Sequence, residues 1–378
     1  MASETYHPAF TNPPADVIAG IPVKHFNLPV PNISYDLPYY EACSKHIKDT
    51  YHASRIYIVA SRSLCANTDK LDLLIQAIGK DQVALANSIS TPDQLARYSV
   101  ESKDKPEHVV EPEVPLICIP TSLSGGEYFS LAGGTEDSTN HKHGFFHSGM
   151  GSRLIILDPE LCLTTPEYHW LSTGFRSFDH CVEALCSLEG NPRSDAKAEE
   201  GLRLLAPNLL KCKKDPSDVE ARKQCQLAVV LAMEAVRSGT PMGGSHAIGH
   251  QLGPLGVPHG VTSTILNPAV MKYNILHGKD KPEIARRQEK IKEILWSEPE
   301  VLQTLQQGGL DQNTSDLGDL LDVYVRSLGL PRALKEMDIT PDKIPGLSER
   351  ALADFWSPTN PVPLLKAEQV KEILEMVA

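Results

Sequence analysis

The pattern of apolar residues changes near residue 160, and this change limits the folds that the chain can adopt. Before it, short apolar runs alternate with an amphipathic stretch. Strands are expected at 55–60 (RIYIVA), 114–119 (VPLICI) and 154–157 (LIIL), and a helix is expected at 69–78, ending at Gly79. Apolar strands separated by helices are typical of a parallel α/β sheet. The first part of the chain is therefore predicted to be an α/β domain.

The second part of the chain carries helical patterns alone. Thr165 and Pro166 are typical of a helix start, and this first helix should reach about residue 188, with Gly174 as a point of interruption. Ser217 to Glu220 has the spacing of a capping box for a helix that ends near 236. Further helices are expected at 282–296, 316–327 and 367–376. The predicted domains are an α/β domain over residues 1–160 and an all-α domain over 161–378.

Charge and composition exclude several function classes. The formal net charge of −12 argues against binding to nucleic acid or to anionic membranes, since both need basic patches. No apolar run approaches the length of a membrane span, and the N-terminus lacks the pattern of a signal peptide. The eight cysteines contain no Cys-x-x-Cys pair, so reduced thiols and a cytoplasmic location are expected.

Histidines cluster at helical spacing in two segments of the second part. Arg176 and His180 are four residues apart, as are His246 and His250, so each pair shares one face of a helix. His259 follows after a turn marked by glycines and a proline. Imidazoles presented in this way are typical ligands of a transition metal, although a single helical histidine is more often a hydrogen-bonded core or surface residue. The third histidine favours a functional site.

Several separated motifs occur in the order found in one known family. They are Pro120-Thr121, Asp158-Pro159-Glu160, Gly174 with His180 and Glu183, His-x-x-x-His at 246–250 followed by Pro258-His259-Gly260, Asn267-Pro268, Met271 to Asn274, and Asn360-Pro361. From about Ala53 onward the chain resembles the iron-containing alcohol dehydrogenases, with maleylacetate reductases and, more remotely, dehydroquinate synthases among the relatives. The resemblance implies a nucleotide-binding α/β domain, a helical domain and an active site in the cleft between them.

The resemblance also implies a metal site, from which this chain departs. In metal-dependent relatives an aspartate and three histidines hold the ion; His180, His246 and His259 match the histidines, and His250 matches a proton-transfer histidine. Arg176 stands at the aspartate position. A guanidinium repels a cation by about 4 kcal/mol per unit charge at ~4 Å and an effective ε of ~20.

We therefore expect no metal, and we predict Arg176, His246 and His250 as catalytic residues, with Arg176 polarising a substrate oxygen. The alternative for Arg176 is an ion pair with an acid such as Asp179 or Glu183.

The glycine-rich turn that binds NAD(P) in the relatives is missing. Gly20 and Gly79 are the only glycines before Leu123, and 34 residues separate Gly79 from Val114, where one βαβ unit alone needs ~30 or more. We expect an internal deletion after Gly79, although an exon omitted from the coding sequence would look the same. The parallel sheet should then be truncated and NAD(P) binding weak. Residual binding is expected at the Pro120–Gly126 loop, through Thr121, Ser122, Ser124 and Gly125.

These features predict a metal-independent NAD(P)-type oxidoreductase that acts on a small carbonyl or alcohol in a biosynthetic or aromatic-compound pathway. Two alternatives stay open: a non-redox enzyme for cyclisation, isomerisation or elimination in the same cleft, and a non-catalytic relative. A small-molecule substrate is the expected partner, and a homodimer is the candidate assembly.

Overall fold

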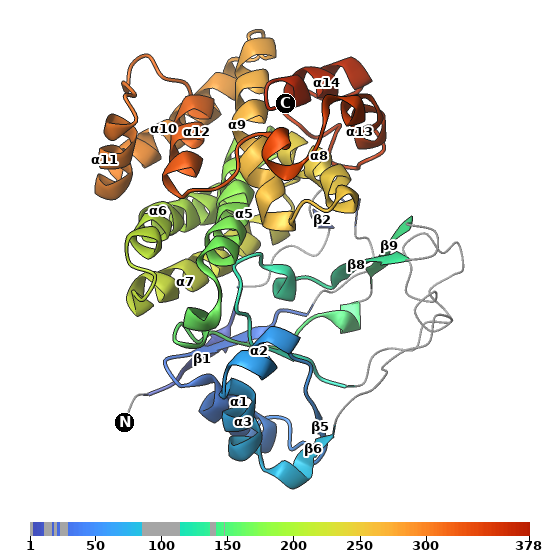
Figure 1. Ribbon diagram of the computed structural model, residues 1–378, viewed down its shortest axis with the longest axis vertical. Helices are drawn as coiled ribbons and strands as arrows, with labels where there is room; N and C mark the ends of the chain where they lie inside the picture. The colour runs from blue at the N-terminus through green and yellow to red at the C-terminus, as the bar shows by residue number, and fades with distance from the viewer. Residues whose placement is uncertain are drawn as a thin grey trace. The chain divides into compact units, whose positions relative to one another are not determined.

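The computed structural model describes residues 3–10, 17–18, 21–22, 29–84, 114–136, 141–146 and 148–378. These residues divide into two compact units (Figure 1). Residues 17–18, 21–22, 122–124 and 166–378 belong to the second unit, and the other described residues to the first. The assignment of domains to 1–160 and 161–378 stays a prediction.

The first unit contains a four-stranded sheet with the order β1-β4-β10-β7. Its strands are β1 (Thr5–Pro8), β4 (Asn32–Tyr35), β7 (Ile117–Cys118) and β10 (Leu154–Ile156). β1 runs antiparallel to β4, whereas β10 runs parallel to β4 and to β7, with Ile155 opposite Ile33 and Cys118. Helix α1 (Tyr39–Asp49) packs Ala42 and Ile47 with Leu154 and Ile156 of the sheet in one apolar cluster. The predicted α/β character is confirmed.

A smaller βαβ unit follows α1. It consists of β5 (Ile56–Tyr57), α2 (Arg62–Asn67), α3 (Lys70–Ile78) and β6 (Val83–Ala84), with β5 parallel to β6. The helix predicted at 69–78 is confirmed, with Gly79 at its C-terminal cap at φ +108°. The prediction of a buried strand at 55–60 is wrong. The strand has two residues, and Tyr57 and Val59 are 51% and 79% exposed. An apolar run is buried only where neighbouring strands cover it, and β5 pairs with a strand of two residues.

The remaining strands are β2 (Val17–Ile18) with β3 (Ile21–Pro22), and β8 (Leu131–Glu136) with β9 (His141–Phe146); each pair is antiparallel. Residues 85–113, which contain most of the stretch where the deletion is predicted, lie outside the described residues.

Helices make up residues 166–378 of the second unit. They are α5 (Glu167–Cys186), α6 (Pro192–Lys214), α7 (Val219–Arg237), α8 (Gly244–Leu252), α9 (His259–His277), α10 (Pro282–Ser297), α11 (Pro299–Gln307), α12 (Leu317–Ser327), α13 (Ile344–Ala351) and α14 (Ala367–Glu375). The helices predicted in this part are confirmed, with small changes at their ends. α5 continues through Gly174 without a break, and Asp218 rather than Ser217 caps α7 by accepting a hydrogen bond from the amide of Ala221. None of the helices in the described part of the chain is long and apolar enough to cross a membrane.

Helix α5 lies at the centre of the second unit, between α6 and α7 on one side and α8 and α9 on the other (Figure 1). Its residues Trp170, Phe175 and Phe178 are buried, and Phe178 stacks on Tyr324 of α12 at a centroid distance of 5.0 Å. The crossing of α5 and α9 requires a glycine at 260, since a Cβ there would lie 2.7 Å from the carbonyl carbon of Ser172. This close crossing brings the polar residues of α5 next to those of α8 and α9.

Candidate active site

Three helices bring the predicted site residues together within the second unit. α5 carries Arg176 and His180, α8 carries His246 and His250, and α9 begins at His259. The rings of His180 and His246 lie 4.7 Å apart between centroids, and those of His250 and His259 lie 6.3 Å apart. His246 is fully buried, whereas His250 keeps 22% of its side chain exposed. The histidines therefore form one group that extends from the interior toward the surface.

Two acids of α5 hold α8 in position. Glu183 accepts hydrogen bonds from the backbone amides of Gly243 (2.9 Å) and Ser245 (2.8 Å), the first residues of the α8 turn. Asp179 accepts hydrogen bonds from the hydroxyl of Ser245 (2.7 Å) and from the amide of Asn267 on α9. Burial raises the pKa of both carboxyls, and the hydrogen bonds act in the opposite direction. The role of Glu183 in holding α8 was not predicted from the sequence.

The two inner histidines are neutral. Nδ1 of His246 lies 2.7 Å from Oε2 of Glu183; with the carboxylate as acceptor, Nδ1 carries the proton and Nε2 keeps the lone pair. Nε2 of His246 and Nδ1 of His180 are both buried without a hydrogen-bond partner. Burial, with the charge of Arg176, holds the pKa of both imidazoles well below the ordinary value. Both rings therefore offer lone pairs rather than positive charge.

Arg176 is a buried cation without an acidic partner. Its side chain is 2% exposed, and Nη1 donates a hydrogen bond to the hydroxyl of Ser263 (2.9 Å), while Nε has no partner. In the described part of the chain no carboxylate lies within ion-pair distance of the guanidinium, so the alternative of an ion pair with Asp179 or Glu183 is wrong. The reason is that these two carboxylates bind α8 and α9 instead. Burial lowers the pKa of Arg176, and the charges of the two acids oppose this effect at longer range.

A loop after α13 orients His250. This contact was not predicted from the sequence. Nδ1 of His250 lies 2.7 Å from Oδ2 of Asp354, and the ring stacks on Trp356 at 5.3 Å between centroids. The backbone amide of Trp356 donates to the other oxygen of Asp354 (3.0 Å), which fixes the carboxylate. Asp354 lies 104 residues from His250, so no local spacing could indicate the pair. Nδ1 is therefore held by an acid, and Nε2 is the nitrogen left for a substrate.

Comparison with known proteins agrees with the arrangement of these motifs. The family model described as "Fe-containing alcohol dehydrogenase family, C-terminal" matches residues 170–378, more than half of the chain. The chain belongs to the iron-containing alcohol dehydrogenase family. It is similar to Dehydrogenase ALT3 of Alternaria alternata (36% identity, covering 82% of this chain and 81% of the relative) and to Dehydrogenase FUM7 of Gibberella moniliformis (33%, covering 92% and 96%).

Solved structures of the family share the fold. A 1,3-propanediol oxidoreductase superimposes with a TM-score of 0.75 at 20% identity, covering 94% of this chain and all of that one. Maleylacetate reductase from Agrobacterium tumefaciens superimposes with a TM-score of 0.65 at 19% identity, covering 91% and 95%. The expected fold class, an N-terminal α/β part and a C-terminal helical part, is confirmed. As a member of the family, this protein is an NAD-type dehydrogenase or reductase.

Three buried groups of this dehydrogenase lie close enough to suggest a metal site. Asp179, Glu183 and His246 have potential ligand atoms within 4.8 Å of one another. However, the carboxylate oxygens and Nδ1 of His246 are engaged in the hydrogen bonds that join α5 to α8 and α9. Arg176 is close enough to His180 and His246 for its charge to lower their pKa values. A metal bound by Asp179, Glu183 and His246 would displace these hydrogen bonds, and a metal bound by the two histidines would lie near the charge of Arg176.

The residues predicted to contact the cofactor lie on both sides of Leu123. The backbone carbonyl of Thr121 accepts a hydrogen bond from the hydroxyl of Thr165 (2.7 Å). Leu123 is buried, and its amide donates to the hydroxyl of Thr173 on α5 (3.1 Å). Gly125 has φ +75°, a conformation that favours glycine. The roles of Thr121, Ser122, Ser124 and Gly125 toward NAD(P) stay predictions.

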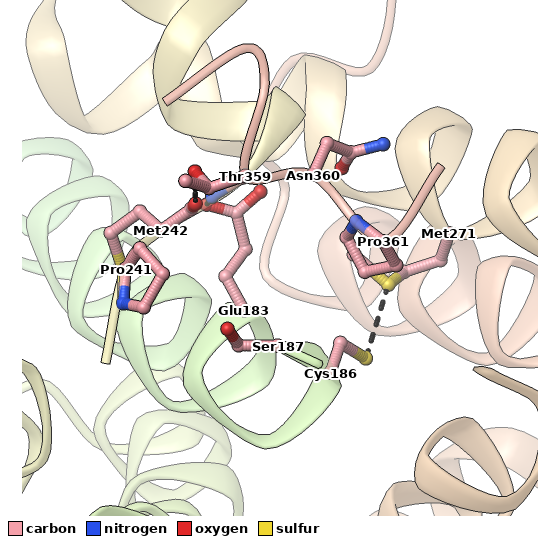
Figure 2. Close-up of a pocket in the computed structure, with 10 residues that line it drawn as sticks. Glu183, Cys186, Ser187, Pro241, Met242, Met271, Thr359, Asn360 and Pro361 are labelled. Carbon is pink, nitrogen blue, oxygen red and sulfur yellow. Dashed lines mark hydrogen bonds between the residues drawn. The ribbon is translucent and has the colours of Figure 1, made fainter. Parts of the chain in front are cut away.

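A small cavity adjoins Glu183 but is not a binding site. Figure 2 shows Glu183 beside Met242 and Thr359, with Cys186 and Met271 in contact across the far side. The cavity holds about 180 Å³ of empty space, whereas ligand sites usually need about 300 Å³ or more. Gly243 lies in this wall, and a Cβ there would come within 2.9 Å of Oδ1 of Asn360. The cavity therefore reflects packing around the Glu183 hydrogen bonds.

Proposed function

We propose that this enzyme transfers a hydride between NAD(P) and a small carbonyl or alcohol without a metal ion, in a biosynthetic or aromatic-compound pathway. The observation that carries the proposal is the buried Arg176, which stands where the family resemblance places the metal-binding aspartate and has no acidic partner. The named relatives are dehydrogenases, which favours this function over a non-redox or a non-catalytic role. A cytoplasmic homodimer is the form in which we expect the enzyme to act.

Arg176 supplies the electrostatic part of the mechanism. NAD(P), when bound, supplies or accepts the hydride. As a hydride reaches a carbonyl carbon, negative charge develops on the oxygen, and a fixed guanidinium nearby stabilises it. At ~4 Å and an effective ε of ~20 the attraction is about 4 kcal/mol. Arg176 is already desolvated and held by Ser263, so little reorganisation accompanies the reaction.

His250 supplies the proton. Asp354 holds Nδ1 of His250 and orients the ring, so Nε2 is the nitrogen left for the substrate. The side chain of His250 is 22% exposed, which allows the ring to exchange its proton with solvent. His246 and His180 are neutral and buried and do not act as acids in this scheme.

A direct test of the proposed function is the oxidation of NADPH, followed by absorbance, with a panel of aldehydes and ketones in the presence of a chelator. The proposal requires turnover that the chelator leaves unchanged.

Replacing Arg176 by aspartate should create a metal site. The substitution removes the repelling cation and restores a carboxylate beside the lone pairs of His180 and His246. Both proteins are incubated with Zn²⁺ or Fe²⁺, dialysed and examined by elemental analysis. The variant Arg176→Asp should retain about one ion per chain, because the three histidines define a single site. The natural protein should retain no stoichiometric metal. Adding His246→Ala to Arg176→Asp is the control and should abolish retention. One ion per natural chain, lost on substituting His246 and His259, would show that the enzyme is metal-dependent.

Substitution of Asp354 by asparagine should slow the reaction. The change keeps the size of the side chain but removes the carboxylate that holds Nδ1 of His250 and orients its ring. A hydrogen bond to a charged group contributes roughly 1.5–3 kcal/mol, so kcat should fall about 10- to 100-fold. KM should change little, because Asp354 contacts His250 rather than the substrate. Equal losses in kcat and in thermal stability would instead indicate a structural role for Asp354 alone.

A further inference from the structure

Arg176 has more hydrogen-bond capacity than the protein uses. A guanidinium carries five N–H donors, and the described residues satisfy one of them, through Ser263. Nε is among the buried atoms without a partner. We propose that Arg176 binds a carboxylate of the substrate, so that the site takes short oxo acids and the corresponding hydroxy acids rather than neutral aldehydes or ketones. This inference rests on the proposed function and names its substrate class.

The first argument is the cost of an unpaired cation. A buried charge without a counter-ion is strongly unfavourable, and arginine cannot relieve it by losing a proton. The charges of Asp179, Glu183 and Asp354 act on Arg176 at longer range, but no ion pair forms, because the oxygens of these acids bind other groups. A ligand that brings its own negative charge supplies the missing partner. A neutral aldehyde would leave the charge as it is.

The second argument is the shape and chemistry of the unpartnered atoms. Nε of Arg176, Nδ1 of His180 and Nε2 of His246 are all buried without a hydrogen bond. Planar guanidinium groups match carboxylates in a bidentate fashion. The neutral imidazole of His246 offers a lone pair at Nε2, which suits the hydroxyl of a hydroxy acid. The unpartnered Nε of Arg176 supplies a donor for a carboxylate oxygen or for the oxo oxygen that becomes the alcohol.

Matched pairs of substrates test the inference. We would compare 2-oxobutanoate with its methyl ester, and 3-oxobutanoate with its ethyl ester, in the natural enzyme at one ionic strength. Two charge-assisted hydrogen bonds predict that kcat/KM for the acids exceeds that for the esters by at least about 100-fold. In Arg176→Met the ratio of kcat/KM for acid to ester should fall to about one. Arg176→Lys keeps the positive charge but loses the planar, bidentate guanidinium, so its ratio should be intermediate. Arg222→Met is the matched control, because Arg222 is equally buried but stacks on Trp170 of α5 and bonds the carbonyl of Pro216.

A binding measurement separates this inference from the proposed redox function. 2-Oxobutanoate at millimolar concentration should raise the melting temperature of the natural protein and leave that of Arg176→Met unchanged, with sodium chloride at equal ionic strength as the blank. If no carbonyl compound is reduced but this shift occurs, the redox function fails and the carboxylate site stands. Reduction of esters or of phosphorylated aldehydes as fast as acids overturns the inference and leaves the redox function intact. Neither turnover nor a shift overturns both. Should Arg176→Met not fold, the ratio of acid to ester in the natural enzyme and in Arg176→Lys decides.

Discussion

Calorimetric titration with NADH or NADPH should give a dissociation constant in the millimolar range. In the relatives a glycine-rich turn donates backbone hydrogen bonds to the pyrophosphate, and this chain has two glycines before Leu123. Each hydrogen bond to a charged group contributes roughly 1.5–3 kcal/mol, so losing three weakens binding by on the order of 5 kcal/mol, or 10³ to 10⁴ in affinity. The alignment with the Gibberella relative supports this expectation: it spans 415 positions, more than the 378 residues of the chain, so several tens of positions have no residue here.

The same titration can contradict the deletion. A dissociation constant below ~10 μM would mean that another segment has taken over the role of the glycine turn, since a micromolar site corresponds to about 8 kcal/mol of binding free energy. The Pro120–Gly126 loop is the first place to look for it, and Ser124→Ala is the variant that would test this loop. Sequencing the transcript across codons 79 to 89 is the necessary control. A longer transcript would show that an exon is missing from the coding sequence, and the titration should then be repeated with the restored chain.

Replacing His250 by alanine should lower kcat by about 10²- to 10⁴-fold, the usual contribution of a positioned general acid or base. The fold should change little, because the ring is partly exposed and its interactions are the hydrogen bond to Asp354 and stacking on Trp356 and His259. Activity and melting temperature have to be measured on the same preparation. A large fall in both would assign His250 a packing role.

His277→Ala is a suitable control for this substitution. His277 lies at the C-terminal end of α9, is 39% exposed at its side chain and pairs with Glu372, away from the residues assigned to the mechanism. We expect its removal to leave kcat unchanged within a factor of about two, as for most surface substitutions. Full activity of His250→Ala with an unchanged melting temperature would remove His250 from the mechanism.

Local patterns predicted some helices of the second unit and missed others: α5, α7, α10, α12 and α14 were expected, whereas α6, α9, α11 and α13 were not. The helices of residues 166–378 have strong apolar periodicity and side-chain caps such as Asp218, which act within one turn. The strand at 55–60 was overestimated because burial of an apolar run depends on strands elsewhere in the chain. Helical spacing also placed His246 and His250 correctly on one helix.

The polar connections of the site were beyond sequence reasoning. An ion pair of Arg176 with an acid such as Asp179 or Glu183 was the alternative left open by the sequence. The structure gives these acids partners 60 or more residues away in the sequence, at α8 and α9. Which partner an acid takes depends on the crossing of the helices, and this crossing depends on close contacts such as Gly260 against Ser172. The pair of His250 and Asp354 was missed for the same reason.

The hydrogen bonds from Glu183 to the first amides of α8 have a consequence for the evolution of the family. A carboxylate at a helix N-terminus is stabilised by the helix dipole, and here it comes from a neighbouring helix rather than from the helix itself. Hydrogen bonds from Glu183 and Asp179 join α5 to α8. The histidines of these helices therefore keep their positions without a bound ion. An arginine in place of an aspartate at position 176 therefore still leaves an ordered site for other chemistry. Conversely, a designer who grafts this site onto another scaffold has to move 176–183 and 243–250 as one block.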